Sequence, residues 1–238
     1  MDLSVLPTAD ELSPIGSRAP RWSPGLHCAL HSEIFADGCE ASGAAVALAL
    51  MLGAVPAEDE RSVLWVQDAA SLRLTGRPYR HGLPARLRDR VIHVATSRPE
   101  DALFALEEGL RCRELACVIG ELAGNPKVLD FTASRRLSLA AEKYGVPLFL
   151  VRLDAVRDLS AARMRWQVRA APSRLPRWNA AAPGRPAWRA ELFRTRTYTP
   201  GEWILRDDGQ VLAAERLASA PDHGDLAAAA GGRSLAAS

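Results

Sequence analysis

The chain has 238 residues, of which 48% are hydrophobic and 24% charged, with a formal net charge of +2. This length and composition suit one α/β domain with short appendages. It contains neither the run of about eighteen apolar residues that a membrane helix needs nor a basic start followed by an apolar run, so we expect a cytoplasmic protein without a membrane span or signal peptide.

Residues 1–25 hold four prolines and two glycines, a composition typical of a flexible N-terminal arm. Between residues 26 and 151, apolar runs alternate with helical patterns, which predicts a doubly wound, mostly parallel sheet. The runs that predict strands are Ile34–Ala36, Val63–Val66, Val91–Val94, Leu115–Ile119 and Val146–Val151. The predicted helices are Val46–Leu52 closed by Gly53, one opening at Pro99, and Ser134–Tyr144 closed by Gly145, while Leu72–Leu83 is predicted as a loop.

The pattern changes after Arg152. Met164–Ala170 predicts a strand with one buried face, and a loop rich in Pro and Trp follows at 171–186. Trp188–Phe193 and Glu202–Arg206 predict antiparallel strands, with Asp208-Gly209 as a hairpin turn. We therefore divide the chain into an arm (1–25), a domain (26–217, with a parallel part 26–151 and an antiparallel part 152–217) and an Ala/Gly/Ser-rich tail (218–238) that we expect to be disordered.

Positive charge is concentrated in the antiparallel part. Between Arg152 and Arg206 the chain has twelve Arg against four acidic residues, which makes this part a candidate surface for an anionic partner. The alternative is that this chain uses Arg in place of Lys throughout, because Lys127 and Lys143 are its only lysines. The arginines would then indicate no particular partner.

A glycine loop at Asp37–Ala45 lies between the first predicted strand and the first predicted helix. Gly38 and Gly43 have the spacing of a phosphate-binding loop, but Ala44 and Ala45 stand where such a loop has Lys and Ser or Thr. A charge-assisted hydrogen bond contributes about 1.5–3 kcal/mol, so losing the Lys alone weakens nucleotide binding roughly tenfold to a hundredfold. The stretch is either a degenerate nucleotide loop or an ordinary strand–turn–helix corner.

The four cysteines lack the spacing of a metal finger. His27, Cys28 and His31 form the one Cys/His cluster in the sequence, and it offers too few ligands for a structural metal. We expect buried free thiols, no metal and no cofactor.

Taken together, these patterns resemble the RecA-like core, and more narrowly the ImuA family of RecA/SulA-related proteins from bacterial inducible-mutagenesis operons. The resemblance covers roughly residues 26–215. The stretches that carry it are Leu30–Phe35, Val63–Asp68, Leu110–Cys112, Leu129–Leu137, Met164–Trp166, Glu191–Arg196 and Gly201–Trp203.

The resemblance places Glu121 at the metal-associated acid of a RecA-type ATPase, and puts Ala69-Ala70 where the water-activating acid belongs, with Asp68 the nearest carboxylate. Glu121 could equally be a strand-end residue that caps a turn. The phosphate-loop pattern is kept at Gly38, Glu40, Ser42 and Gly43 and broken at Ala44 and Ala45. The two loops that bind single-stranded DNA in recombinases shrink here to about 123–127 and 153–162, so we expect no strand exchange.

A basic pair spaced by one residue, on a late strand, reaches the neighbouring subunit's nucleotide in the RecA fold, and Arg194 and Arg196 match it. The resemblance implies a retained contact across a subunit-type interface. The alternative is two solvated side chains that alternate outward from a strand.

The resemblance implies a pseudo-ATPase, not an enzyme, that supports SOS-induced translesion synthesis at the nucleoid. Its implied partners are an ImuB-type polymerase relative and a mutagenic replicative-type polymerase, with RecA as a further candidate and DNA contact weak or indirect. Three alternatives remain: a divergent nucleotide-dependent ATPase, a single-stranded-DNA-binding module that uses the Arg-rich part, and a SulA-like inhibitor of cell division.

Overall fold

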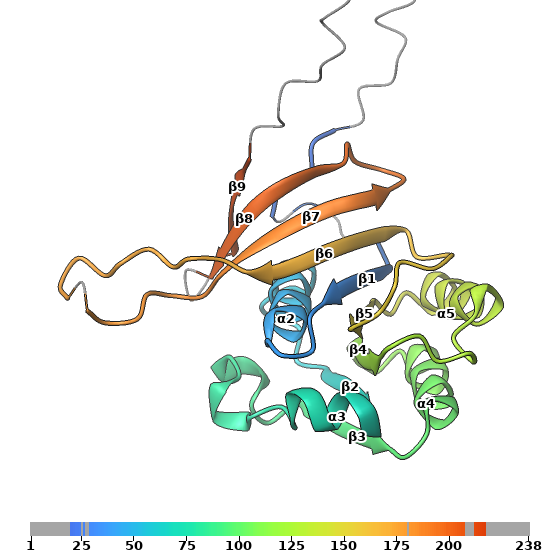
Figure 1. Ribbon diagram of the computed structural model, residues 1–238. Helices are drawn as coiled ribbons and strands as arrows, with labels where there is room; N and C mark the ends of the chain where they lie inside the picture. Colours follow the sequence, from blue (N-terminus) through green and yellow to red (C-terminus); the bar gives the residue numbers. More distant parts are fainter. Residues whose placement is uncertain (1–19, 25, 27–28, 180, 208–211, 218–238) are drawn as a thin grey trace, which may run out of the picture.

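The computed structural model describes residues 20–24, 26, 29–179, 181–207 and 212–217. Within them the strands form one nine-stranded sheet in the order β3-β2-β4-β5-β1-β6-β7-β8-β9 (Figure 1). The parallel half holds β1 (His31–Ala36), α2 (Ser42–Ala54), β2 (Ser62–Asp68), α3 (Ala69–Thr75), β3 (Val91–Thr96), α4 (Pro99–Arg111), β4 (Leu115–Ala123), α5 (Phe131–Tyr144) and β5 (Leu148–Leu153). The antiparallel half holds β6 (Met164–Ala170), β7 (Ala187–Thr195), β8 (Gly201–Asp207) and β9 (Leu212–Arg216).

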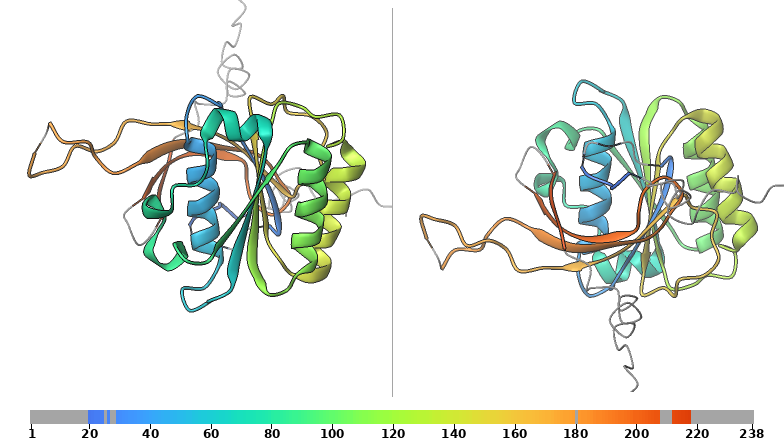
Figure 2. Two further views of the ribbon diagram at one scale, coloured as in Figure 1. Left: turned by 90° about the horizontal axis from the view of Figure 1, so that it is seen from below. Right: turned by 90° about the horizontal axis from the view of Figure 1, so that it is seen from above.

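Two layers of helices enclose the parallel half, with α2 on one face of the sheet and α4 and α5 on the other (Figure 2). The strands that pair in parallel are β1 with β5 and β6, β2 with β3 and β4, and β4 with β5. The predicted α/β fold with a mostly parallel sheet and a C-terminal antiparallel extension is therefore confirmed, and this arrangement is that of a RecA-like fold.

Local sequence explains where the helices on the second face begin and end. Helix α4 has Pro at its first position and two acids in its first turn, which suit the missing donor and the positive end of the helix dipole. The Asp130 side chain accepts a hydrogen bond from the Ala133 N–H at the start of α5, and Gly145 ends that helix in the left-handed conformation with φ 70°. The predicted end at Gly145 is confirmed.

The antiparallel half continues the sheet past β1 and bends over the side of α2 (Figures 1 and 2). Trp166 and Trp203 from this half pack edge-on against Trp22, with ring centroids 4.8 and 5.5 Å from the Trp22 ring. Trp22 is 2% exposed, so the described part of the segment expected to be a flexible arm (1–25) is anchored in the core. Residues 1–19 and the predicted tail, 218–238, lie outside the described residues.

Several local predictions differ from the structure. Helix α2 passes through Gly53 and ends at Ala54, because a glycine inside a well-packed helix is tolerated. The predicted loop 72–83 begins in α3, whose start is capped by Asp68, and continues through 3-10 turns at Arg80–Gly82 and Ala85–Leu87. Strand β9 was not predicted, and the predicted turn at 208–209 lies outside the described residues.

The cysteines also depart from expectation. Cys117 is a buried free thiol as expected, and burial raises its pKa. Cys39 and Cys112 are free but exposed, because Cys39 lies on the glycine loop and Cys112 on the turn after α4. Within the described residues no three His, Cys, Asp or Glu side chains form a group that could hold a metal ion. His27 and Cys28 lie outside those residues.

Candidate functional site

The glycine loop follows β1 and leads directly into α2. Gly43, in the first turn of α2, faces the sheet: a Cβ there would lie 2.7 Å from Val151 Cγ1 and 2.9 Å from Ala36 Cβ. Both distances are too short for van der Waals contact, so glycine lets α2 lie close to β1 and β5. Packing alone therefore accounts for the second glycine of the motif.

Three carboxylates hold the loop in place. The Gly38 N–H donates to Asp154 Oδ1 at 2.8 Å, and the Cys39 N–H donates to Asp37 Oδ1 at 2.8 Å. Asp154 directly follows β5 and has a φ of 50°, in the left-handed region, where Asp is among the tolerated residues. The hydrogen bond with Cys39 lowers the pKa of Asp37, and Asp37 in turn raises the pKa of the Cys39 thiol.

Glu40 links the loop by hydrogen bonds to Ala170, the last residue of β6. Its carboxylate accepts from Ser42 Oγ at 2.9 Å and from the Ala170 N–H at 3.0 and 3.1 Å. The Ser42 hydroxyl is therefore engaged within the loop. Ala44 and Ala45, in the first turn of α2, are half-buried and pack on the core. The loop and the groups that hold it thus include three acidic side chains, Asp37, Glu40 and Asp154, and the loop itself has no Lys or Arg.

The two acids considered for metal and water chemistry both have structural partners. Asp68 accepts from Ser71 N–H at 2.7 Å and from Ser71 Oγ at 2.6 Å, which caps α3. Glu121 is 1% exposed and accepts from Trp65 Nε1 at 2.6 Å and from Thr75 Oγ1 at 3.0 Å. Burial raises the pKa of Glu121, opposed by these hydrogen bonds. Glu121 was expected at the end of its strand. It lies inside β4 instead, because that strand continues to Ala123.

The short connections after β4 and β5 lie against each other. The Val156 N–H donates to Asn125 Oδ1 at 2.7 Å, and Asn125 Nδ2 donates to the Val156 carbonyl at 3.2 Å. Asn125 Nδ2 also donates to the Asp158 carboxylate. These contacts use the polar groups of both connections to join them to each other.

Arg194 and Arg196 are both exposed, but only Arg194 lies within a strand. Arg194 lies near the end of β7, opposite Arg165, whereas Arg196 lies beyond the last strand residue, Thr195. The expectation that both side chains extend from one strand face therefore fails, because β7 ends between them. Among the described residues neither forms an ion pair. The two acids closest to them in sequence pair with other residues, Glu191 with Arg157 and Glu202 with Arg189.

A buried ion pair joins the two halves and was not predicted. Glu33 and Arg165 are register partners on β1 and β6, and Arg165 Nε donates to Glu33 Oε2 at 2.7 Å. Ser160 Oγ donates to the other Glu33 oxygen at 2.7 Å. The guanidinium also lies over the rings of Phe35 and Phe193, 5.0 and 5.4 Å from their centroids. An acidic residue on one apolar strand and a basic residue on the other are the sequence signal that indicates such a pair.

No helix in the described part of the chain combines the length and apolar character needed to cross a membrane. Two curated relatives, each named Protein ImuA, come from Caulobacter vibrioides strains NA1000 / CB15N and ATCC 19089 / CIP 103742 / CB 15. Each is 35% identical to this chain over 184 residues, covering 72% of the chain and 72% of the relative. No protein-family model matches the chain.

Proposed function

The chain belongs to the ImuA family, and from this premise we propose that it is a non-catalytic accessory protein of damage-induced, error-prone translesion DNA synthesis. It acts by protein contacts within a mutagenesis assembly. The partners we propose are an ImuB-type polymerase relative and a mutagenic replicative-type polymerase, with RecA as a third candidate.

The observation that carries the non-catalytic part of the proposal is the acidic glycine loop. Phosphoryl transfer needs cations at the β- and γ-phosphates and a positioned base or water. Here Asp37 and Asp154 accept hydrogen bonds from the loop's own N–H groups, so a triphosphate would meet like charges. Asp68 and Glu121 cannot stand in as catalytic acids without giving up buried hydrogen bonds.

The remaining nucleotide-fold architecture supports a role as a protein scaffold. The sheet and its helices keep the shape of a RecA-like domain, and the exposed Arg194 and Arg196 leave positive charge for an acidic partner surface. We infer that the fold is retained for the surface it presents.

The test measures partner capture and ATP turnover on the same purified chain. The tagged chain should capture the ImuB-type protein equally well with and without ATP-Mg²⁺, and its turnover should stay at background. Capture that requires ATP, or turnover that disappears in Gly43→Asp, would favour the divergent ATPase instead. The Gly43→Asp control requires a melting curve, because a side chain at 43 would meet Val151.

A further inference from the structure

The described residues of the connection between β6 and β7 (171–179 and 181–186) form a second arm, here called the β6–β7 arm, that projects away from the sheet (Figure 1). It carries Arg174, Arg177 and Arg185 and has no acidic residue. Trp178 on this arm is 81% exposed. An indole with so little contact to its own protein is unusual, because tryptophan is highly buried on average, and it marks a candidate binding surface.

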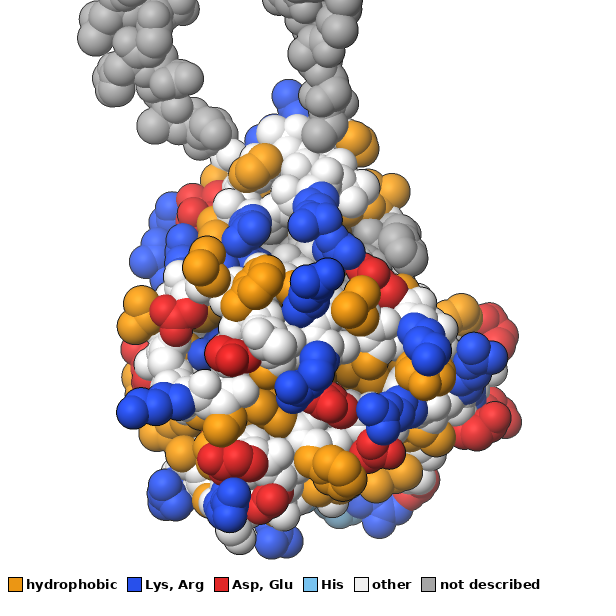
Figure 3. Space-filling view, turned by 90° about the vertical axis from the view of Figure 1, so that its right-hand side faces the viewer, with side chains coloured by type: hydrophobic (Ala, Val, Ile, Leu, Met, Phe, Trp, Pro, Cys, Tyr) orange, Lys and Arg blue, Asp and Glu red, His pale blue; other side chains and the backbone are white. Residues whose placement is uncertain are grey.

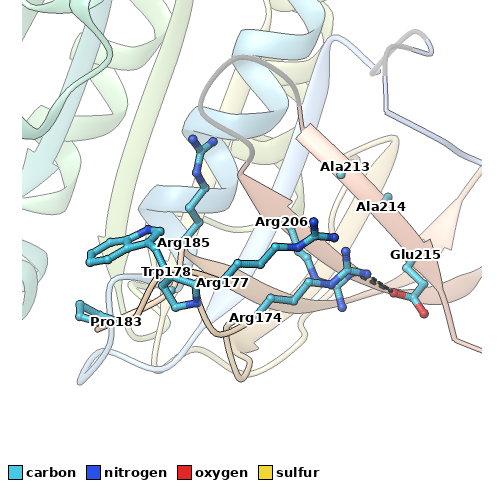
Figure 4. Close-up of a pocket in the computed structure, with 11 residues that line it drawn as sticks. Arg174, Arg177, Trp178, Pro183, Arg185, Arg206, Ala213, Ala214 and Glu215 are labelled. Carbon is cyan, nitrogen blue, oxygen red and sulfur yellow. Dashed lines mark hydrogen bonds and ion pairs between the residues drawn. The ribbon is translucent and has the colours of Figure 1, made fainter. Parts of the chain in front are cut away.

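A cavity of about 570 Å³ lies between the arm and strands β8 and β9 (Figure 4). Its charged lining consists of Arg174, Arg177, Arg185, Arg206 and Glu215. Four positive charges and one negative charge leave it at +3. Glu215 accepts from Arg206 at 2.9 Å and lies 3.5 Å from Arg174, while Arg177 and Arg185 form no ion pair with any described residue.

An exposed indole flanked by unpaired guanidiniums fits a ligand that alternates flat apolar groups with negative charges. Single-stranded nucleic acid has this chemistry, since each unstacked base can stack on an aromatic ring while its phosphate pairs with Arg. A duplex keeps its bases stacked on one another and offers only its phosphates. An acidic peptide would satisfy the guanidiniums without covering the indole.

We propose that this arm binds single-stranded DNA, with Trp178 stacking on a base and Arg177, Arg185 and Arg174 contacting neighbouring phosphates. The site is separate from the glycine loop and from Arg194 and Arg196. It does not rest on the proposed accessory function, because the binding is a property of the isolated chain. Of the Arg-rich antiparallel half, the segment proposed to contact DNA is therefore the connection between β6 and β7.

The experiment follows the fluorescence anisotropy of a labelled oligo-dT with the full chain. Trp178→Ala should weaken binding roughly fivefold to a hundredfold, whereas Trp178→Phe, which keeps an aromatic face, should retain most of the affinity. Arg177→Ala with Arg185→Ala should also lower the slope of log affinity against log salt by about 1.4, which corresponds to two phosphate contacts on a single strand.

The matched control is Phe104→Ala with Arg135→Ala. It removes an exposed aromatic ring and an exposed Arg from α4 and α5, at the end of the molecule where acidic and basic side chains are interspersed (Figure 3). This variant should bind oligo-dT as the unaltered chain does. All variants should have the same melting temperature as the unaltered chain, because the substituted side chains are exposed.

Three outcomes would overturn the proposal. One is the absence of oligo-dT binding at low salt, and another is unchanged affinity in Trp178→Ala. The third is binding of polyglutamate as tightly as oligo-dT, which would assign the arm to an acidic protein partner.

Discussion

Two carboxylates of the parallel half and three arginines of the antiparallel half are placed in opposite ways. In the parallel half, Asp154 and Glu121 bond to the chain's own loop and strands. In the antiparallel half, Arg177, Arg185 and Arg194 are directed outward with no ion pair among the described residues. The carboxylates of the parallel half are thus engaged within the chain, whereas these three arginines of the antiparallel half stay available to a partner.

The largest expected effect is at the seam between the halves. Arg165→Ala leaves Glu33 buried without its counter-charge, and breaking one partner of a buried pair costs about 3–5 kcal/mol. Urea denaturation should show this loss in the free energy of unfolding. The matched control, Arg111→Ala, breaks an exposed pair with Glu108 and should cost less than about 1 kcal/mol. Equal losses would mean that the seam is not a stabilising junction.

The parallel half should also be the more sensitive to pH. His31 is buried in β1 with its Nδ1 2.7 Å from Ser138 Oγ, and burial lowers its pKa from 6.5 to about 4. Its contribution is complete above pH 6.5 and is lost as pH falls towards 4, because the unfolded chain takes up the proton first. A shift of this size corresponds to about 3 kcal/mol.

The variant His31→Gln isolates this effect from other titrating groups, including Glu121, whose raised pKa changes stability in the opposite direction as pH falls. The difference in unfolding free energy between the two proteins should shrink between pH 7 and pH 4. A difference that stays constant over this range would show that His31 is not desolvated in the folded protein.

The smallest effect on stability is expected at the exposed arginines of the antiparallel half. Arg194→Ala with Arg196→Ala should change the unfolding free energy by no more than about 0.5 kcal/mol. Capture of the ImuB-type partner or RecA should weaken by roughly 2–5 kcal/mol if the contacts are buried at the interface, and little if they lie on its rim. The matched control is Arg73→Ala with Arg77→Ala, two exposed arginines of the parallel half. Full capture of both partners by the Arg194→Ala, Arg196→Ala variant would show that Arg194 and Arg196 are solvated residues with no role in partner binding.

Much of the fold could be predicted because it depends on local patterns. Apolar runs located the parallel strands, and the alternation at Met164–Ala170 gave the bounds of β6. Helix α3 was missed although part of its signal is local: Asp68, directly before the helix, is a favoured N-cap residue. The burial of Trp22 was missed because proline-rich composition hides a single anchoring residue.

The loss of Lys at position 44 could be read directly from the sequence, but the role of Asp154 could not. Asp154 and Gly38 are far apart in the chain and meet only because β5 and β1 are neighbours in the sheet. The same holds for Glu33 and Arg165, whose pairing follows from strand register. Contacts of this kind depend on topology, which composition and periodicity do not specify.

We propose that the glycine loop is closed to nucleotides by its own carboxylates and by the missing Lys. Isothermal titration of the full chain with ATP-Mg²⁺ tests this directly, beside a variant that combines Ala44→Lys, Ala45→Thr and Asp154→Asn. We expect no saturable binding by the unaltered chain up to a Kd of about 1 mM, equivalent to about −4 kcal/mol, and measurable binding without turnover by the variant. Saturable binding of ATP-Mg²⁺ by the unaltered chain at micromolar Kd would contradict it.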